Sequence, residues 1–188
     1  MWDIQAKGTA GVIQPLRTFE EHKGVVEDVA WSRHDENVFG SVGDDKNMIL
    51  YDLRNDKHSF TIEAHSEEIN SIDFNHFNKH LILSGSNDKT IALWDMRNLS
   101  HKLHTFNSHR NEVISARWNT KIETLFASSS ADRRINVWDL GQISAKQSAV
   151  DAEDGPPELL VKSKIYLSSS TEDTPRRYLT SAGTPTKT

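Results

Sequence analysis

The sequence predicts an all-β fold built from repeated four-stranded sheets, and three observations carry that prediction. Three segments align with one another, and in each a histidine precedes an aromatic residue by 29 positions. The spacing from one of these histidines to the next is 43 and then 44 residues. Apolar residues alternate with polar ones in short runs such as "INSIDF", which is the period of a strand with one buried face. The histidine and aromatic pairs are His22 and Tyr51, His65 and Trp94, and His109 and Trp138.

Each repeat contains several short strand-like runs separated by turn residues. In the first repeat these runs are "VVEDVAW", "NVFGSV" and "MILYDL", which are rich in β-branched and aromatic residues. The stretches "GDDKN", "SNDKT" and "ADRRI" have the composition of tight turns between two strands. A single four-stranded sheet cannot cover its own apolar faces, so the repeats must stack on one another.

The period and the end of each repeat indicate a known family. Each repeat closes on an aromatic residue followed by aspartate, "YD" once and "WD" twice. A period of about 40–45 residues with this ending resembles the WD40 family. The resemblance implies a WD40 β-propeller fragment, with about three complete four-stranded blades of a seven-bladed ring.

The repeats divide the chain into three parts. Residues 1–15 are expected to hold the end of a preceding blade and a linker, because "MWDIQAKG" resembles the close of another repeat. Residues 16–164 are expected to form the three repeats, with "PLRTFEEH" as an outer strand and an acidic loop at 151–158. Residues 165–188 are rich in Ser and Thr and are predicted to be a disordered tail. There Thr174 and Thr184 precede prolines and are candidates for phosphorylation. Three repeats cannot close a ring, so we expect a fragment or a truncated variant.

Composition excludes several classes of function. The net charge of −5 argues against direct binding of nucleic acid, which requires clustered Lys and Arg. The absence of cysteine excludes disulfides and thiolate metal sites. No apolar run approaches the length of a membrane helix, so we expect no membrane contact. The histidine-rich stretches "NHFNKH" and "SHKLH" lack partners at ligand spacing, so no metal and no cofactor are expected.

A set of four polar and aromatic residues recurs in every repeat. Aspartate lies 6 and serine 10 positions before each aromatic residue. A Ser-His-Asp set also suggests a hydrolase, but the chain has no Gly-x-Ser-x-Gly motif and a catalytic triad would not be needed three times. We therefore expect a buried hydrogen-bond network that joins the loop before each first strand to the next two strands. The three sets are His22, Ser41, Asp45 and Tyr51; His65, Ser84, Asp88 and Trp94; and His109, Ser128, Asp132 and Trp138.

Several longer stretches resemble one group of propellers in particular. "VVEDVAW", "FGSVGDDK", "DKTIALWDMRNL" and above all "DAEDGPPELL" are similar to the retinoblastoma-binding histone chaperone family. The resemblance covers residues 16–160 and fails after Leu160. It implies a non-enzymatic nuclear scaffold that holds histones H3 and H4 for chromatin assembly, deacetylase, remodelling and polycomb complexes.

The resemblance also implies two binding sites. At the acidic loop, a helix of histone H4 would bind with Asp151 and Asp154 against an arginine, on a return stiffened by prolines and beside an apolar wall. At the narrow face, Glu27, Asn70 and Glu112 match positions that bind the histone H3 tail. Ile114 stands where the family has an aromatic residue, so peptide binding is expected to be weaker. The stiffening residues are Pro156 and Pro157, and the wall residues are Leu159 and Leu160.

Two other functions stay open at this point. A generic WD40 adaptor, such as a ubiquitin-ligase substrate receptor, would use the same narrow face and would need no acidic loop. A truncated product without function is the third interpretation, favoured by the tail that departs from the family.

Overall fold

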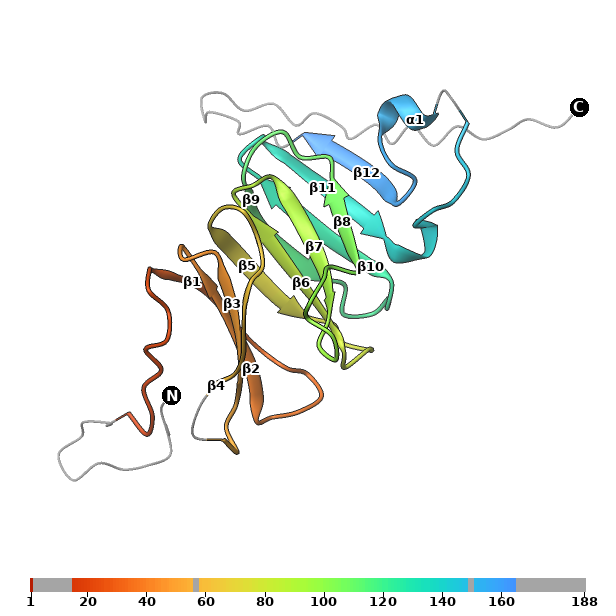
Figure 1. The fold of residues 1–188 in the computed structure, drawn as a ribbon. Helices are drawn as coiled ribbons and strands as arrows, with labels where there is room; N and C mark the ends of the chain where they lie inside the picture. Colours follow the sequence, from red (N-terminus) through yellow and green to blue (C-terminus); the bar gives the residue numbers. More distant parts are fainter. Residues whose placement is uncertain (2–14, 56–57, 149–150, 165–188) are drawn as a thin grey trace, which may run out of the picture.

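The computed structural model describes residues 1, 15–55, 58–148 and 151–164. In these ranges the chain forms twelve strands, arranged as three four-stranded antiparallel sheets that stack side by side (Figure 1). Within each sheet the strands follow one another in sequence order. The predicted all-β propeller fragment with three blades is therefore confirmed. No helix in the described part of the chain is long and apolar enough to cross a membrane.

Each blade takes its outermost strand from residues that follow the aromatic-Asp pair. Blade 1 contains β1 (Val26–Trp31), β2 (Val38–Gly43), β3 (Asn47–Asp52) and β4 (His58–Glu63). Blade 2 contains β5 (Ile69–Phe74), β6 (Leu81–Ser86), β7 (Thr90–Asp95) and β8 (His104–Asn107). Blade 3 contains β9 (Val113–Trp118), β10 (Leu125–Ser130), β11 (Arg134–Asp139) and β12 (Leu159–Lys164). Between β11 and β12 lie a 3₁₀ turn (Leu140–Gln142) and the short helix α1 (Asp151–Asp154).

The turn between the second and third strand has the same geometry in all three blades. One residue of each turn adopts a left-handed conformation, Lys46 at φ 65°, Lys89 at φ 73° and Arg133 at φ 64°. This conformation is unfavourable for a residue with a side chain. The aspartate just before it compensates, because its carboxylate accepts the backbone N–H two residues on, at 2.9–3.2 Å.

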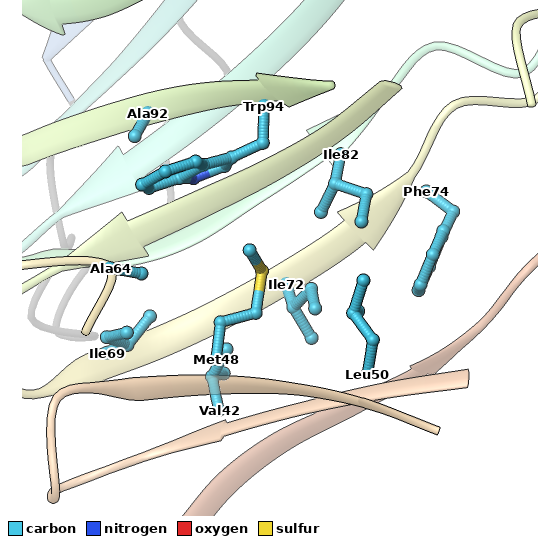
Figure 2. Packing of buried hydrophobic residues seen from close by; sticks show 10 residues of the cluster. All are labelled: Val42, Met48, Leu50, Ala64, Ile69, Ile72, Phe74, Ile82, Ala92 and Trp94. Carbon is cyan, nitrogen blue, oxygen red and sulfur yellow. The ribbon is translucent and has the colours of Figure 1, made fainter. Parts of the chain in front are cut away.

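The hydrophobic core lies between the blades. Figure 2 shows the cluster between blades 1 and 2, where Met48 and Leu50 of blade 1 face Ile72, Phe74 and Ile82 of blade 2. A second cluster joins the other face of blade 2 to blade 3. Blade 2 is therefore covered on both faces, as stacked sheets require.

Polar contacts between the innermost strands tie the three blades together. A carboxylate oxygen of Asp28 accepts the backbone N–H of Ile72 at 2.9 Å, and the Ser71 hydroxyl accepts that of Ala116 at 3.0 Å. Arg117 of blade 3 donates to the same Asp28 oxygen at 2.8 Å and also to the carbonyl of Ile72. These bonds satisfy side-chain and backbone groups at the seams between the sheets.

The segment before β1 differs from the prediction. "PLRTFEEH" was expected to be an outer strand, but within the described residues 15–24 only Pro15 makes an isolated bridge. Phe19 instead packs edge-on against Phe39 and Tyr51, with ring centres 5.1 and 5.0 Å apart. Aromatic packing thus takes the place of strand pairing here. The expectations for residues 1–15 and for the tail at 165–188 lie outside the described residues, apart from Met1 and Pro15.

The outer face of blade 1 exposes residues that are buried at the same repeat positions elsewhere. Val26, Val29 and Trp31 are 45%, 52% and 44% exposed. Their counterparts in blade 2, Ile69, Ile72 and Phe74, are at most 2% exposed. The exposed residues line a cavity of about 460 Å³ together with Phe19 and Phe39 among others. This face has the apolar composition of the faces that pack between blades, but within the described residues no sheet packs against it.

Substitutions at equivalent positions of blades 1 and 2 test whether the outer face of blade 1 is exposed in solution. Val29→Lys should change the free energy of unfolding little, because the new ammonium group stays in water. Ile72→Lys should lower it by more than about 3 kcal/mol, because it buries a charge and removes core packing. Thermal denaturation of both variants measures the difference. An equally large loss for Val29→Lys would mean that the blade 1 face is covered in solution.

Candidate functional site

The second repeat brings its four predicted residues into one continuous hydrogen-bond chain. The indole N–H of Trp94 donates to the Ser84 hydroxyl at 2.9 Å. The same hydroxyl lies 2.7 Å from His65 Nε2, and His65 Nδ1 lies 2.9 Å from a carboxylate oxygen of Asp88. Since the serine hydroxyl proton is free to face Nε2, the Nδ1–H then points at the carboxylate. These hydrogen bonds therefore link β7, through β6, to the loop before β5.

The third repeat reproduces this arrangement and the first repeat departs from it. In blade 3 the corresponding distances are 2.9, 2.7 and 3.1 Å, between Trp138, Ser128, His109 and Asp132 in turn. In blade 1, His22 keeps its contacts with Ser41 at 2.7 Å and Asp45 at 2.9 Å. Tyr51 replaces the tryptophan there, and its hydroxyl donates to Glu21 at 3.3 Å. The blade 1 set therefore lacks the indole donor.

Burial determines the charge state of these groups. Burial lowers the pKa of His65 and of His109, so both imidazoles are neutral near pH 7. Burial also opposes ionisation of Asp88, but hydrogen bonds from His65 and Thr90 outweigh it and hold the pKa of that carboxyl well below its usual value. Ser84 is fully buried and already accepts an indole N–H. Its hydroxyl is therefore part of the framework of the blade rather than accessible to a substrate.

Replacing the central serine with alanine should destabilise a blade that has the indole donor more than blade 1, which lacks it. Ser84→Ala leaves the Trp94 N–H and one His65 nitrogen buried without partners, and should cost about 2–3 kcal/mol of unfolding free energy. Ser41→Ala leaves no indole N–H unpaired, so it should cost about 1 kcal/mol less. Urea denaturation of both variants provides the comparison. Equal losses would show that the indole bond contributes nothing to the blade.

The buried histidines predict how stability depends on pH. Because the folded-state pKa values of His65 and His109 lie below the ordinary value of about 6.5, the unfolded chain binds more protons below that pH. Stability should therefore fall as the pH drops from about 7.5 to 5.5. The depressed pKa values of Asp88 and Asp132 add a further loss below about pH 4.

Urea midpoints measured across this range test the sign of the effect. The variant His65→Gln should show a shallower decline, because one of the two protonation sites is gone. A midpoint that rises toward pH 5.5 would contradict the assignment of neutral buried histidines.

The acidic loop leaves β11 and returns as β12 at the outer edge of blade 3, with α1 beyond it (Figure 1). Ser148 holds the first residue of α1, since its hydroxyl accepts the backbone N–H of Asp151 at 3.2 Å and donates to the Asp151 carboxylate at 2.7 Å. Asp151, Glu153 and Asp154 are all exposed. The helix thus presents three carboxylates to solvent, one of them held by Ser148.

The return of the loop is a tight, proline-containing turn. Gly155 has a φ of 141°, which favours glycine, and its carbonyl accepts a bond from Gln147 at 3.2 Å. Pro156 and Pro157 follow, both half-buried, and the carbonyl of Pro156 accepts the N–H of Leu159 at 2.9 Å. Two adjacent proline rings, each of which fixes the φ angle of its residue, give this turn little conformational freedom.

The apolar wall of the loop differs from the expected pair of leucines. Leu159 packs against the core between blades 2 and 3, so its side chain is not presented to solvent as a wall residue. Leu160 is 48% exposed and Val161 50% exposed. The bulge where Val137 pairs with Val161 and Trp138 with Leu159 leaves these two residues on the outside. Val161 was not predicted, because a bulge in pairing cannot be read from the local sequence.

Glu158, the last acid of the loop, is also a residue that sequence reasoning missed. It is 5% exposed, and one of its carboxylate oxygens lies 3.0 Å from His104 Nε2. Nothing in the acidic run distinguishes it from the exposed acids. Its partner lies 54 residues away in sequence.

At the narrow face, the structure leaves three of the four predicted residues exposed. Glu27, Glu112 and Ile114 face solvent. Asn70 is half-buried, and its amide donates to Asn87 at 2.6 Å and to the carbonyl of Val113 at 2.8 Å. Asn70 therefore joins blade 2 to blade 3 in this structure. In the described ranges, no group of three His, Asp or Glu side chains is arranged to hold a metal ion.

A comparison with family models gives a match over most of the described chain. The model of the WD40 family, described as WD domain, G-beta repeat, matches residues 13–52, 56–95 and 100–139. The chain belongs to the WD40 family. These three matches coincide with the three repeats, and each ends at the aspartate that closes the third strand of a WD40 blade.

Two curated WD40 relatives match part of the chain. WD-40 repeat-containing protein MSI3 of Arabidopsis thaliana is 42% identical over 57 residues, which is 30% of this chain and 13% of that protein. Histone acetyltransferase type B subunit 2 of Mycosarcoma maydis is 44% identical over 54 residues, 28% of this chain and 12% of that protein. The matched part of the chain thus spans about an eighth of the length of each relative. These matches confirm, over part of the chain, the family resemblance seen in the sequence.

Proposed function

We propose that this WD40 chain is a non-enzymatic, nuclear, histone-binding scaffold that holds histones H3 and H4 for complexes that assemble, deacetylate, remodel or methylate chromatin. The name of one relative, a subunit of a histone acetyltransferase, supports a chromatin role. The observation that carries the proposal is the acidic loop. Its helix α1 exposes three carboxylates, and Leu160 and Val161 are exposed in β12, the strand that follows.

The chemistry of this loop suits a basic amphipathic helix such as that of histone H4. A guanidinium group accommodates two carboxylates at once, and Asp151 and Asp154 are one helical turn apart on α1. Ser148 already orients the Asp151 carboxylate. The apolar side of the bound helix would lie on Leu160 and Val161. The half-buried prolines reduce the freedom that binding would otherwise have to remove.

The narrow face is the proposed site for the histone H3 tail. Glu27 and Glu112 are exposed carboxylates available to lysine or arginine side chains. Asn70 would support the site through its existing bonds to Asn87 and Val113 rather than as a free contact. Ile114 offers an aliphatic surface in place of an aromatic ring, which removes a cation–π contribution.

Two titrations of the chain test the proposal, one with a peptide of the first H4 helix and one with an H3 tail peptide. Charge-assisted contacts contribute about 1.5–3 kcal/mol each. Asp151→Ala with Asp154→Ala should therefore weaken binding of the H4 peptide by about tenfold to several hundredfold, allowing for coupling between neighbours. Binding of the H3 peptide should not change. Glu36→Ala with Glu123→Ala is the matched control, because it removes the same charge at exposed sites outside the acidic loop.

Each other result identifies a different failure. Equal losses for both peptides would mean that the double variant disrupts blade 3. An unchanged H4 affinity would mean that the loop is solvated surface. If the folded chain bound neither peptide, the histone assignment would be wrong and a generic WD40 adaptor would be favoured.

A further inference from the structure

The acidic loop is joined to the neighbouring blade through a partly buried contact between two side chains. Glu158 precedes β12 of blade 3, and His104 begins β8, the outermost strand of blade 2. A carboxylate oxygen of Glu158 lies 3.0 Å from His104 Nε2. The side chain of Glu158 is 7% exposed and that of His104 is 29% exposed. This contact is therefore largely shielded from water at the seam between two blades.

Glu158 differs from the other acidic residues of the loop because its side chain is buried. Asp151, Glu153 and Asp154 point into solvent, where they are available to a ligand. The main chain of Glu158 is held as well, because its carbonyl accepts the N–H of Asp139 at 2.9 Å. Both its side chain and its backbone are thus fixed where the loop rejoins the sheet. A carboxylate in such a place needs its partner, since a buried unpaired charge is costly.

His104 is itself rigidly placed. It pairs with Leu93 in the β7–β8 ladder, and its ring packs edge-on against Phe106 with centres 4.6 Å apart. Phe106 is fully buried in the core between blades 2 and 3. The histidine therefore offers Glu158 a partner whose position is set by the core.

His104 differs from the residues at the equivalent position of the other two blades. Comparison of strand pairing gives the equivalent position in the other blades: Leu50 pairs with Phe60 in blade 1, and Val137 pairs with Val161 in blade 3. The position is apolar in both. It carries an imidazole only in blade 2, the blade that faces the acidic loop. A packing role alone does not account for a polar side chain at this one site.

We infer that Glu158 and His104 are positioning residues, and that their contact holds the acidic loop against blade 2 so that the α1 carboxylates are oriented before any ligand arrives. The ligand part of this inference rests on the proposed histone-helix function. The positioning part concerns the free chain alone. An anchored loop loses less conformational freedom on binding, so the contact raises affinity without touching the ligand.

Amide hydrogen exchange of the full chain tests the anchoring directly. His104→Phe keeps the contact with Phe106 and reproduces the residue found in blade 1, but removes the partner of Glu158. The reporters are the N–H of Asp139, bonded to the Glu158 carbonyl, and the N–H of Ala152 in α1, bonded to the Ser148 carbonyl at 3.1 Å. Exchange at both should become about tenfold faster or more, whereas Ile72 in the core between blades 1 and 2 should be unaffected. Glu153→Gln, which changes an exposed acid of the same loop, is the control and should leave all three unchanged.

A charge-exchange variant separates positioning from packing. His104→Glu combined with Glu158→His reverses the pair and should restore at least part of the protection lost in His104→Phe. Protection that stays at the wild-type level in His104→Phe would overturn the inference. So would a loss of protection at Ile72 as large as that in the loop, because it would mean general destabilisation.

The H4 peptide provides a second, separable measurement. His104→Phe should weaken its binding by about tenfold, with the exposed carboxylates intact. The Asp151 and Asp154 double variant should weaken binding without faster exchange at Asp139. If the wild-type chain binds no H4 peptide, the proposed function fails, and the exchange results still decide whether Glu158 anchors the loop. If the peptide binds and His104→Phe leaves its affinity unchanged while exchange rises, the link from anchoring to affinity is wrong.

Discussion

The contact between the faces of neighbouring sheets is the interaction on which the rest of this structure depends. A four-stranded sheet with two apolar faces gains most of its stability by covering both, and blade 2 does so with Ile72 and Phe74 on one side and Leu83 and Leu93 on the other. The innermost strands add polar bonds at the same seams, such as Asp28 to Ile72. Loops and sites are held in place because the sheets that carry them are fixed relative to one another.

The buried histidine sets give each blade its internal geometry. In blades 2 and 3 the set connects three parts of the blade that are separated in sequence, namely the loop before the first strand, the second strand and the third strand. The aspartate has two tasks, because it holds the histidine and also accepts the N–H that closes the left-handed turn. Such a network is favourable only when every buried member has a partner, which accounts for its full repetition in blades 2 and 3. Tyr51 changes one bond of the first set and redirects a hydroxyl to Glu21.

The acidic loop combines an exposed and a buried use of the same residue type. Asp151, Glu153 and Asp154 are displayed on a short helix, whereas Glu158 is turned inward against His104. The difference follows from the return of the chain through Gly155 and two prolines into the ladder of β12. An exposed carboxylate keeps its hydration and is ready for a cationic partner, and a buried one requires a fixed donor. The loop thus presents charged side chains to solvent, while Glu158 anchors it to blade 2.

The sequence alone determined the all-β class, the three blades and the members of the histidine sets in blades 2 and 3, because these follow from periodicity and from fixed spacing within a repeat. Turn positions such as Lys46 were likewise readable from local composition. Only the tertiary structure decided that Phe19 packs on aromatic rings and that Asn70 is bonded to the next blade. Only the tertiary structure showed Glu158 buried beside His104. These contacts join residues from different blades or across a bulge, and their geometry depends on how whole sheets stack, which no local pattern of residues encodes.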